Sequence, residues 1–212
     1  ERAKFEAEAA NQSKTRFLAA ASHDLLQPLN AARLFTSALS HQPNLDAESM
    51  RLAERIDTAF KAAETLLDAL LEASRLDAGK YRPDIANVAY ADIVEPLRQQ
   101  FSVVAERRGI KLTVHGSRMV VRSDAHLLQR ILQNFVSNAL RYTREGRVVV
   151  GLRRRGDDAL LEVWDTGPGI PPEQQKRIFD EFQRFDQASP WGEQGLGLGL
   201  AICERMARIL GH

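Results

Sequence analysis

Glycine is absent from the first 78 residues of the chain, which contain only two prolines, Pro28 and Pro43. These residues are rich in Ala, Leu, Glu and Arg, which are strong helix formers. Apolar residues recur at helical spacing in two series, one over residues 17–39 and one over residues 52–73. Pro43 lies between the two series in a stretch of turn-forming residues. We therefore predict a helical hairpin over residues 1–78.

A helical hairpin encloses little core by itself. Each helix nevertheless carries an apolar stripe that must be buried. We therefore expect the stripes to pair with those of a second copy of the chain, which makes a homodimer through a four-helix bundle.

The residue pattern changes after this hairpin. Residues 79–86 include Gly79 and Pro83 and are predicted to be a linker, and residues 87–212 form a second domain of mixed helix and strand. Strands are expected over residues 110–115, 120–122, 147–153 and 159–164. Helices are expected over residues 91–108, 124–143 (with Ser123 as N-cap), 171–179 and 196–210. Runs of strands with helices beside them predict an α/β sandwich.

Composition excludes several classes of protein. The 29 Lys and Arg against 28 Asp and Glu give a net charge of +1, which argues against a dedicated nucleic-acid binder. The single cysteine, Cys203, excludes a disulfide framework and predicts a reducing, cytoplasmic location. No apolar run is long enough to span a membrane. The charged start at Glu1 indicates a piece of a longer protein, whose full length could be membrane-anchored.

One histidine of the hairpin is a candidate nucleophile. His23 lies about 160° around the helix from Leu25, so it faces away from the apolar stripe. Asp24 follows it and could orient the imidazole or take its proton. Pro28 removes a backbone hydrogen bond one turn later and should bend the helix. An ordinary surface histidine is the alternative interpretation.

A pair of asparagines is a candidate metal site. Asn134 and Asn138 are four residues apart on a predicted helix, which places both amides on one face. Amide oxygens suit Mg²⁺ that accompanies nucleotide phosphates. The alternative is that one asparagine is a surface residue and the other satisfies a bend in the helix.

Two glycine-containing segments could bind a nucleotide. Asp165 follows a predicted strand and precedes Gly167 and Gly169, and an acid there can accept the exocyclic amine of adenine. Before the last helix, glycines could present N–H groups to phosphates; they are Gly195, Gly197 and Gly199. Leu200 breaks the Rossmann spacing, and no P-loop sequence occurs. The alternative for the segment at Asp165 is a plain hairpin turn, and the alternative for the glycines before the last helix is a flexible hinge.

In this order the motifs resemble those of the sensor histidine kinases of two-component systems. The matching segments are the H box (22–29), N box (134–138), G1 box (165–169), F box (179–182) and G2 box (195–199). Residues 23–35 further resemble hybrid kinases that carry PAS and receiver domains. The resemblance implies a dimeric HisKA hairpin joined to a Bergerat-type, GHKL-class ATP-binding sandwich. Members of the family continue into a last pair of strands, so the sheet is expected to be incomplete here.

The resemblance also implies roles for single residues. His23 would be the phosphoacceptor and Asp24 its acid–base neighbour. Asn138 would be the main Mg²⁺ ligand, supported by Asn134. Asp165 would hold the adenine of ATP. The remaining nucleotide-binding residues would be Arg141, Tyr142, Gly167, Gly169, Arg184, Gly195, Gly197 and Gly199.

Two positions depart from the usual H box. Asp24 stands where glutamate is usual, and Gln27 stands where threonine or asparagine is usual. The residue at position 27 helps to place a hydrolytic water in relatives with phosphatase activity. Glutamine can hydrogen-bond a water, so phosphatase activity stays open.

The predicted function is ATP-dependent phosphorylation of His23, followed by phosphoryl transfer to an aspartate of a receiver domain. One alternative is an ATPase of the GHKL class, but such enzymes have a glutamate base where this chain has Asn134. The other alternative is a dimeric signalling module with a degenerate nucleotide pocket. The intact Asn138 and Asp165 argue against it.

Overall fold

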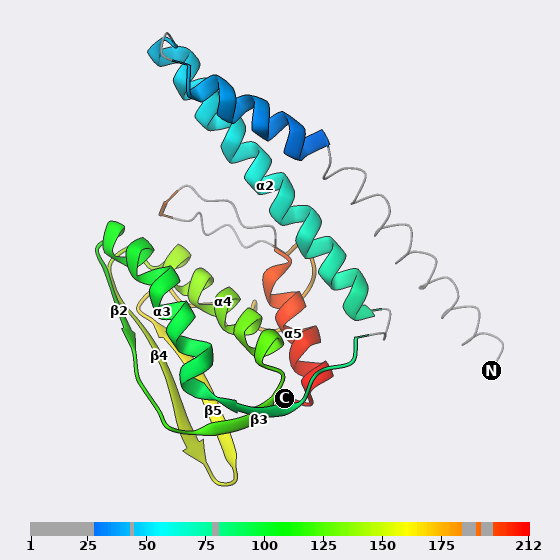
Figure 1. Cartoon of the computed structure of the whole chain (residues 1–212). Coiled ribbons are helices and arrows are strands. Elements are labelled where there is room, and N and C mark those ends of the chain that lie inside the picture. Colours follow the sequence, from blue (N-terminus) through cyan, green and yellow to red (C-terminus); the bar gives the residue numbers. More distant parts are fainter. Residues whose placement is uncertain (1–27, 43–44, 78–80, 184–189, 192–196) are drawn as a thin grey trace, which may run out of the picture. The chain divides into compact units, whose positions relative to one another are not determined.

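The structure is a computed structural model that describes residues 28–42, 45–77, 81–183, 190–191 and 197–212 (Figure 1). The chain divides into two compact units, Glu1–Tyr81 and Arg82–His212. In the described part of the chain, none of the helices has the length and apolar character needed to cross a membrane.

The first unit contains a helix over residues 28–40 and the long helix α2 (Ala47–Asp77). Asp46 precedes α2, and its Oδ1 accepts a hydrogen bond from the Ser49 N–H at 2.6 Å, which lowers the pKa of the Asp46 carboxyl. Arg33 joins the two helices, because its Nη1 lies 2.8 Å from Glu64 Oε2. The predicted helical hairpin is confirmed for these residues.

The hairpin leaves large apolar side chains exposed. Leu34 and Phe35 are 71% and 75% exposed, and Leu39, Leu52 and Ile56 are also exposed. A single hairpin therefore leaves its apolar surface partly uncovered.

Within its described residues, the second unit contains three helices and five strands. The strands are β1 (Ala86–Ala89), β2 (Ile110–Val114), β3 (Val120–Ser123), β4 (Gly146–Arg155) and β5 (Asp158–Asp165). The helices are α3 (Tyr90–Arg107), α4 (Ala125–Tyr142) and α5 (Gly199–Leu210). β1 pairs with β3 antiparallel, whereas β4 pairs with β2 in parallel and with β5 antiparallel. This arrangement confirms the predicted α/β class.

The core of this unit lies between the helices and the three-stranded sheet. Val148 and Val150 of β4 are buried against α3 and α4, with Leu132 of α4 fully buried among them. α5 packs on α4 through buried residues that include Cys203, whose Sγ lies 3.9 Å from the carbonyl oxygen of Ile131. α4 therefore lies between the sheet and α5, and both neighbours fix its rotation.

The start of α4 corrects one prediction. Ser123 belongs to β3, and Asp124 is the N-cap, because its Oδ1 accepts from the Leu127 N–H at 3.0 Å. Its Oδ2 accepts from the Asp84 N–H at 2.9 Å. Burial raises the pKa of the Asp124 carboxyl, but the hydrogen bonds from these backbone N–H groups outweigh burial and lower the pKa overall.

The predicted helix over residues 171–179 is wrong, because the segment forms a series of turns. Gln174 N–H donates to the Pro171 carbonyl at 2.9 Å, and Arg177 N–H donates to Gln174. The segment has few apolar residues and no buried one, so no packed face stabilises a continuous helix there. β1, which the sequence did not predict, is a four-residue strand with a single buried residue, Val88.

Candidate functional site

Helix α4 carries both predicted metal-ligating asparagines. Asn134 Nδ2 donates to the Arg130 carbonyl at 3.2 Å, which fixes the orientation of the amide. Its Oδ1 points toward the start of α5, since a Cβ added at Gly199 would lie 2.5 Å from that oxygen. Asn138 is half-buried one turn further along α4. The glycine that begins α5 is therefore what lets the backbone approach the Asn134 amide.

A tight turn at the end of β5 holds the predicted adenine-binding acid. Asp165 is exposed, and its Oδ1 accepts a hydrogen bond from the Gly167 N–H at 2.8 Å. A Cβ at Gly167 would lie 2.8 Å from that oxygen and 3.3 Å from the Tyr142 carbonyl oxygen. The turn therefore lies directly against the last residues of α4. One oxygen of the Asp165 carboxylate accepts a hydrogen bond within the turn.

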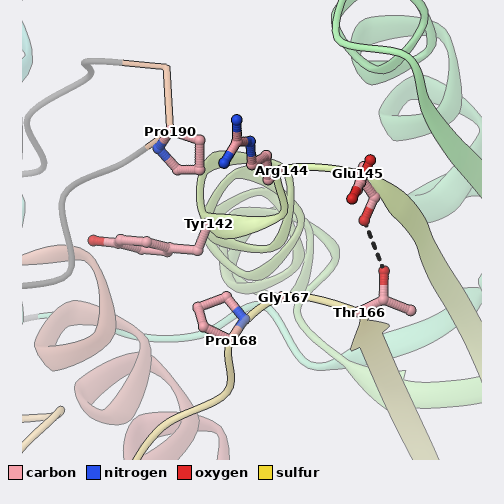
Figure 2. A pocket seen from close by; sticks show the side chains of 7 residues that line it. All are labelled: Tyr142, Arg144, Glu145, Thr166, Gly167, Pro168 and Pro190. Atoms are coloured by element: carbon pink, nitrogen blue, oxygen red, sulfur yellow. Dashed lines mark hydrogen bonds between the residues drawn. The ribbon is translucent and has the colours of Figure 1, made fainter.

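Thr166, between these two residues, anchors the turn to β4. Its Oγ1 accepts from the Arg147 N–H at 3.0 Å and lies 3.3 Å from the Glu145 carbonyl (Figure 2). Thr166 was assigned no role from the sequence. A hydroxyl residue between an acid and a glycine at a strand end is the signal that could have identified it, because such residues hydrogen-bond nearby backbone in turns.

These elements border a cavity of about 370 Å³, within the size range of small-ligand sites. Figure 2 shows the Tyr142 ring between Pro190 and Pro168. The lining residues are Tyr142, Arg144, Glu145, Thr166, Gly167, Pro168 and Pro190. Two predicted nucleotide-binding residues, Tyr142 and Gly167, thus line one cavity beside Asp165.

Gly197, shortly before α5, packs on the end of the predicted F box and the residue that follows it. Gly197 has a φ of +71°, and a Cβ there would lie 2.7 Å from the Gln183 carbonyl oxygen. The Phe182 N–H donates to the Gly197 carbonyl at 3.0 Å. Gly197 is therefore needed both for its backbone conformation and for this close approach.

The structure brings together only part of the predicted site. Arg141 is half-buried near the end of α4, and Gly169 is exposed beyond the turn. The other predicted site residues lie outside the described residues, namely His23, Asp24, Gln27, Arg184 and Gly195.

The asparagine pair could hold a magnesium ion that arrives with phosphates. Among the residues that the structure describes, no group of three or more His, Cys, Asp or Glu side chains could hold a metal ion. Magnesium commonly takes only one or two protein ligands and completes its shell with waters and substrate phosphates. The Asn134 oxygen is turned away from the backbone of its own helix, since its amide nitrogen makes the local hydrogen bond.

Two family models match the chain, one for each unit. Residues 13–79 match the His Kinase A (phospho-acceptor) domain. Residues 123–212 match the histidine kinase-, DNA gyrase B- and HSP90-like ATPase. The second match contains α4, β5 and α5, which are the elements that form the site.

Curated relatives and solved structures agree with these matches. The sensor-like histidine kinase SenX3 of Mycobacterium tuberculosis is 34% identical over 90% of this chain and 47% of its own length. The sensory/regulatory protein RpfC of Xanthomonas campestris is 29% identical over 99% of this chain and 30% of its own. The chain thus spans less than half the length of these relatives.

Among solved structures, full-length ShkA in complex with AMPPNP superposes with a TM-score of 0.77, at 27% identity, over 92% of this chain and 41% of ShkA. The Acinetobacter baumannii histidine kinase AdeS shares the fold, with a TM-score of 0.61 at 19% identity over 89% of this chain and 87% of that structure. Phospho-acceptor and ATPase domains follow one another in this sequence, with relatives that span both. The chain therefore belongs to the sensor histidine kinases, of which it comprises the kinase core.

Proposed function

We propose that the chain binds ATP in its second unit and transfers the γ-phosphoryl group to His23 of its first unit. One observation carries the proposal: three motifs that are distant in sequence meet on α4. The turn at Asp165 lies against the end of α4, and Gly199 lies against Asn134. Residues 1–78 would then act as the phosphoacceptor hairpin and residues 87–212 as the ATP-binding domain, with residues 79–86 linking them.

The adenine base fits the cavity beside Asp165. One oxygen of this carboxylate accepts from Gly167, which leaves the second oxygen to accept a hydrogen bond from an exocyclic amine. Adenine offers an amine at the position where guanine carries a carbonyl. The apolar faces of Tyr142, Pro168 and Pro190 would contact the rings of the base.

The phosphates would lie toward the start of α5, where unpaired helix N–H groups favour anions. Arg141 and Arg184 would add positive charge, and Gly195, like Gly197, would allow the backbone to approach. Asn138 and Asn134 would hold Mg²⁺ through their amide oxygens. When bound, this ion neutralises phosphate charge, which is the main catalytic requirement of phosphoryl transfer.

The transfer itself would use the hairpin. A ring nitrogen of His23 forms a bond to the γ-phosphorus while the bond to the bridging oxygen of ADP breaks. Asp24 would take the proton that the imidazole releases, and Gln27 would hydrogen-bond a water near the phosphorylated histidine. The resulting phosphoramidate is a reactive donor for an aspartate of a receiver domain, in trans or fused downstream.

The exposed apolar side chains of the hairpin support a dimer. Leu34, Phe35, Leu39, Leu52 and Ile56 leave an apolar surface that a second copy of the hairpin would cover in a four-helix bundle. A cytoplasmic location follows from the need for ATP.

The experiment incubates the chain with Mg²⁺ and γ-labelled ATP and compares the wild type with His23→Gln. We expect a label on the wild type that is lost in acid, as phosphohistidine is, and no label on the variant. His41→Gln is the matched control, because His41 is an exposed histidine of the same hairpin. Undiminished labelling of His23→Gln would refute the phosphoacceptor assignment.

The same experiment separates the two alternatives. Release of inorganic phosphate without a labelled protein would indicate an ATPase of the gyrase type. Failure of the wild type to bind an ATP analogue would indicate a signalling module with a degenerate pocket.

A further inference from the structure

Trp191 contacts the C-cap residues of α4 and of α3. Its Nε1–H donates to the Thr143 carbonyl at 3.2 Å. The guanidinium carbon of Arg108 lies 5.2 Å from the centroid of the indole. Arg108 is itself fixed, since its Nη1 donates to the Leu140 carbonyl at 3.1 Å. A carbonyl acceptor at the end of α4 and a cation at the end of α3 therefore hold one indole.

The partners of Trp191 are rigid. Thr143 is completely buried, and its backbone N–H donates to the Ala139 carbonyl as the C-cap of α4. A guanidinium within 6 Å of an indole face is attracted to the ring, more strongly when both are partly removed from water. Trp191 is therefore bound to the C-cap of α4. The residue just before this C-cap, Tyr142, lines the cavity.

The position of Trp191 determines where Pro190 lies. Pro190 precedes Trp191 directly and forms the wall of the cavity on one side of the Tyr142 ring, opposite Pro168 (Figure 2). A proline has a fixed φ and few internal degrees of freedom, so anchoring the next residue also anchors the proline ring. The cavity wall that Pro190 forms beside the Tyr142 ring thus depends on the contacts of Trp191.

We propose that Trp191 is a positioning residue for nucleotide binding, because its contacts with Thr143 and Arg108 fix Pro190 as one wall of the base pocket. The inference rests on the proposed function, in which this cavity receives the adenine. Trp191 touches no nucleotide in this role and acts through Pro190. Its loss should therefore weaken binding and leave the chemical step unchanged.

The test measures the affinity for a non-hydrolysable ATP analogue and the rate of self-labelling. We expect Trp191→Ala to raise the Kd about fivefold to tenfold, since it loses a hydrogen bond and a cation–π contact that pre-organise the pocket. Trp191→Phe keeps the ring over Arg108 and should raise the Kd only about twofold to threefold. The labelling rate at saturating ATP should stay within about twofold of the wild type in both variants.

Tryptophan fluorescence gives a second readout. Trp164, the other tryptophan of the chain, is 64% exposed on β5, and Trp164→Phe leaves Trp191 as the single reporter. In this background we expect the emission of Trp191 to change when the analogue binds, and its quenching by acrylamide to increase in Arg108→Gln. Thermal unfolding controls for folding, and Trp191 is partly exposed, so its variants should remain folded.

The outcomes separate this inference from the proposed function. Equal analogue affinity in the wild type and in Trp191→Ala would overturn the positioning role and leave ATP binding established. The positioning role would also be overturned if Trp191→Ala lowered the labelling rate at saturating ATP by a larger factor than it raised the Kd. Trp191 would then act in the chemical step. Absence of analogue binding by the wild type would overturn the proposed function and this inference with it.

Discussion

Replacing Gly199 by alanine tests whether the first residue of α5 sets the position of the Asn134 amide. An added Cβ would lie 2.5 Å from Asn134 Oδ1, closer than real Cβ contacts come. The atom it meets is the end of a side chain, so the amide should rotate while the backbone stays in place. The rotation would break the hydrogen bond from Nδ2 to the Arg130 carbonyl.

The free-energy change follows from these contacts. Losing the hydrogen bond costs about 0.5–1.5 kcal/mol, and holding the side chain off its preferred rotamer costs about 0.5–1.5 kcal/mol. Alanine in place of glycine in a helix returns up to about 1 kcal/mol. Gly199→Ala should therefore destabilise the second unit by roughly 0–3 kcal/mol. In an Asn134→Ala background only the helix gain remains, so the same substitution should be neutral or stabilising.

The assay is a double-mutant cycle by denaturant unfolding, with Gly199→Ala and Asn134→Ala made singly and together. We expect a coupling of about 1–3 kcal/mol between the two sites. Gly199→Ala should also weaken binding of the Mg²⁺–ATP analogue about as much as Asn134→Ala does. Additivity within about 0.5 kcal/mol would refute the reasoning, as would wild-type affinity in Gly199→Ala.

Two further substitutions test the supports of the site. Gly146 has a φ of +114°, and a Cβ added there would lie only 2.2 Å from Thr166 Oγ1. For both reasons, Gly146→Ala should destabilise the second unit by about 2–4 kcal/mol, measured by thermal unfolding. Gly151→Ala on the same strand meets nothing within 4 Å and is its control; an equal loss there would contradict the explanation. Asp124→Asn tests the lowered pKa of this N-cap: the charged cap stabilises the fold above the unfolded-state pKa of about 3.9, and this contribution is lost as the pH falls through the lower folded-state pKa. Unfolding measured against pH should show a shallower acid limb in the variant, and identical acid limbs would contradict this role for Asp124.

The sequence allowed prediction of the parts of the site that are marked by chemically unusual residues. Asn134 and Asn138 were placed on one helix from their spacing, and Asp165 was placed at a strand end from the glycines after it. Both placements are confirmed. Local spacing is sufficient in these cases because each motif lies within one turn or one helix.

The missed features depend on contacts between distant segments. Trp191 and Arg108 are far apart in the sequence, and nothing in the local pattern of either residue predicts that they meet. The N-cap of α4 was placed one residue early because Ser123 and Asp124 are both good caps, and only the extent of β3 decides between them. The absence of a helix over residues 171–179 likewise depends on what that segment can pack against.

The pairing of the sheet has a consequence for the order of folding. β4 reaches β5 through a two-residue turn at Gly156, whereas β2 reaches β4 only after the chain has passed through β3 and α4. Closing the longer connection costs roughly 2 kcal/mol more chain entropy than closing the short turn. The β4–β5 hairpin, with Asp165 at its end, should therefore form first, and α4 should take its place when β2 docks. The nucleotide pocket is then assembled late in the folding reaction, so the ability to bind ATP would report that this unit has finished folding.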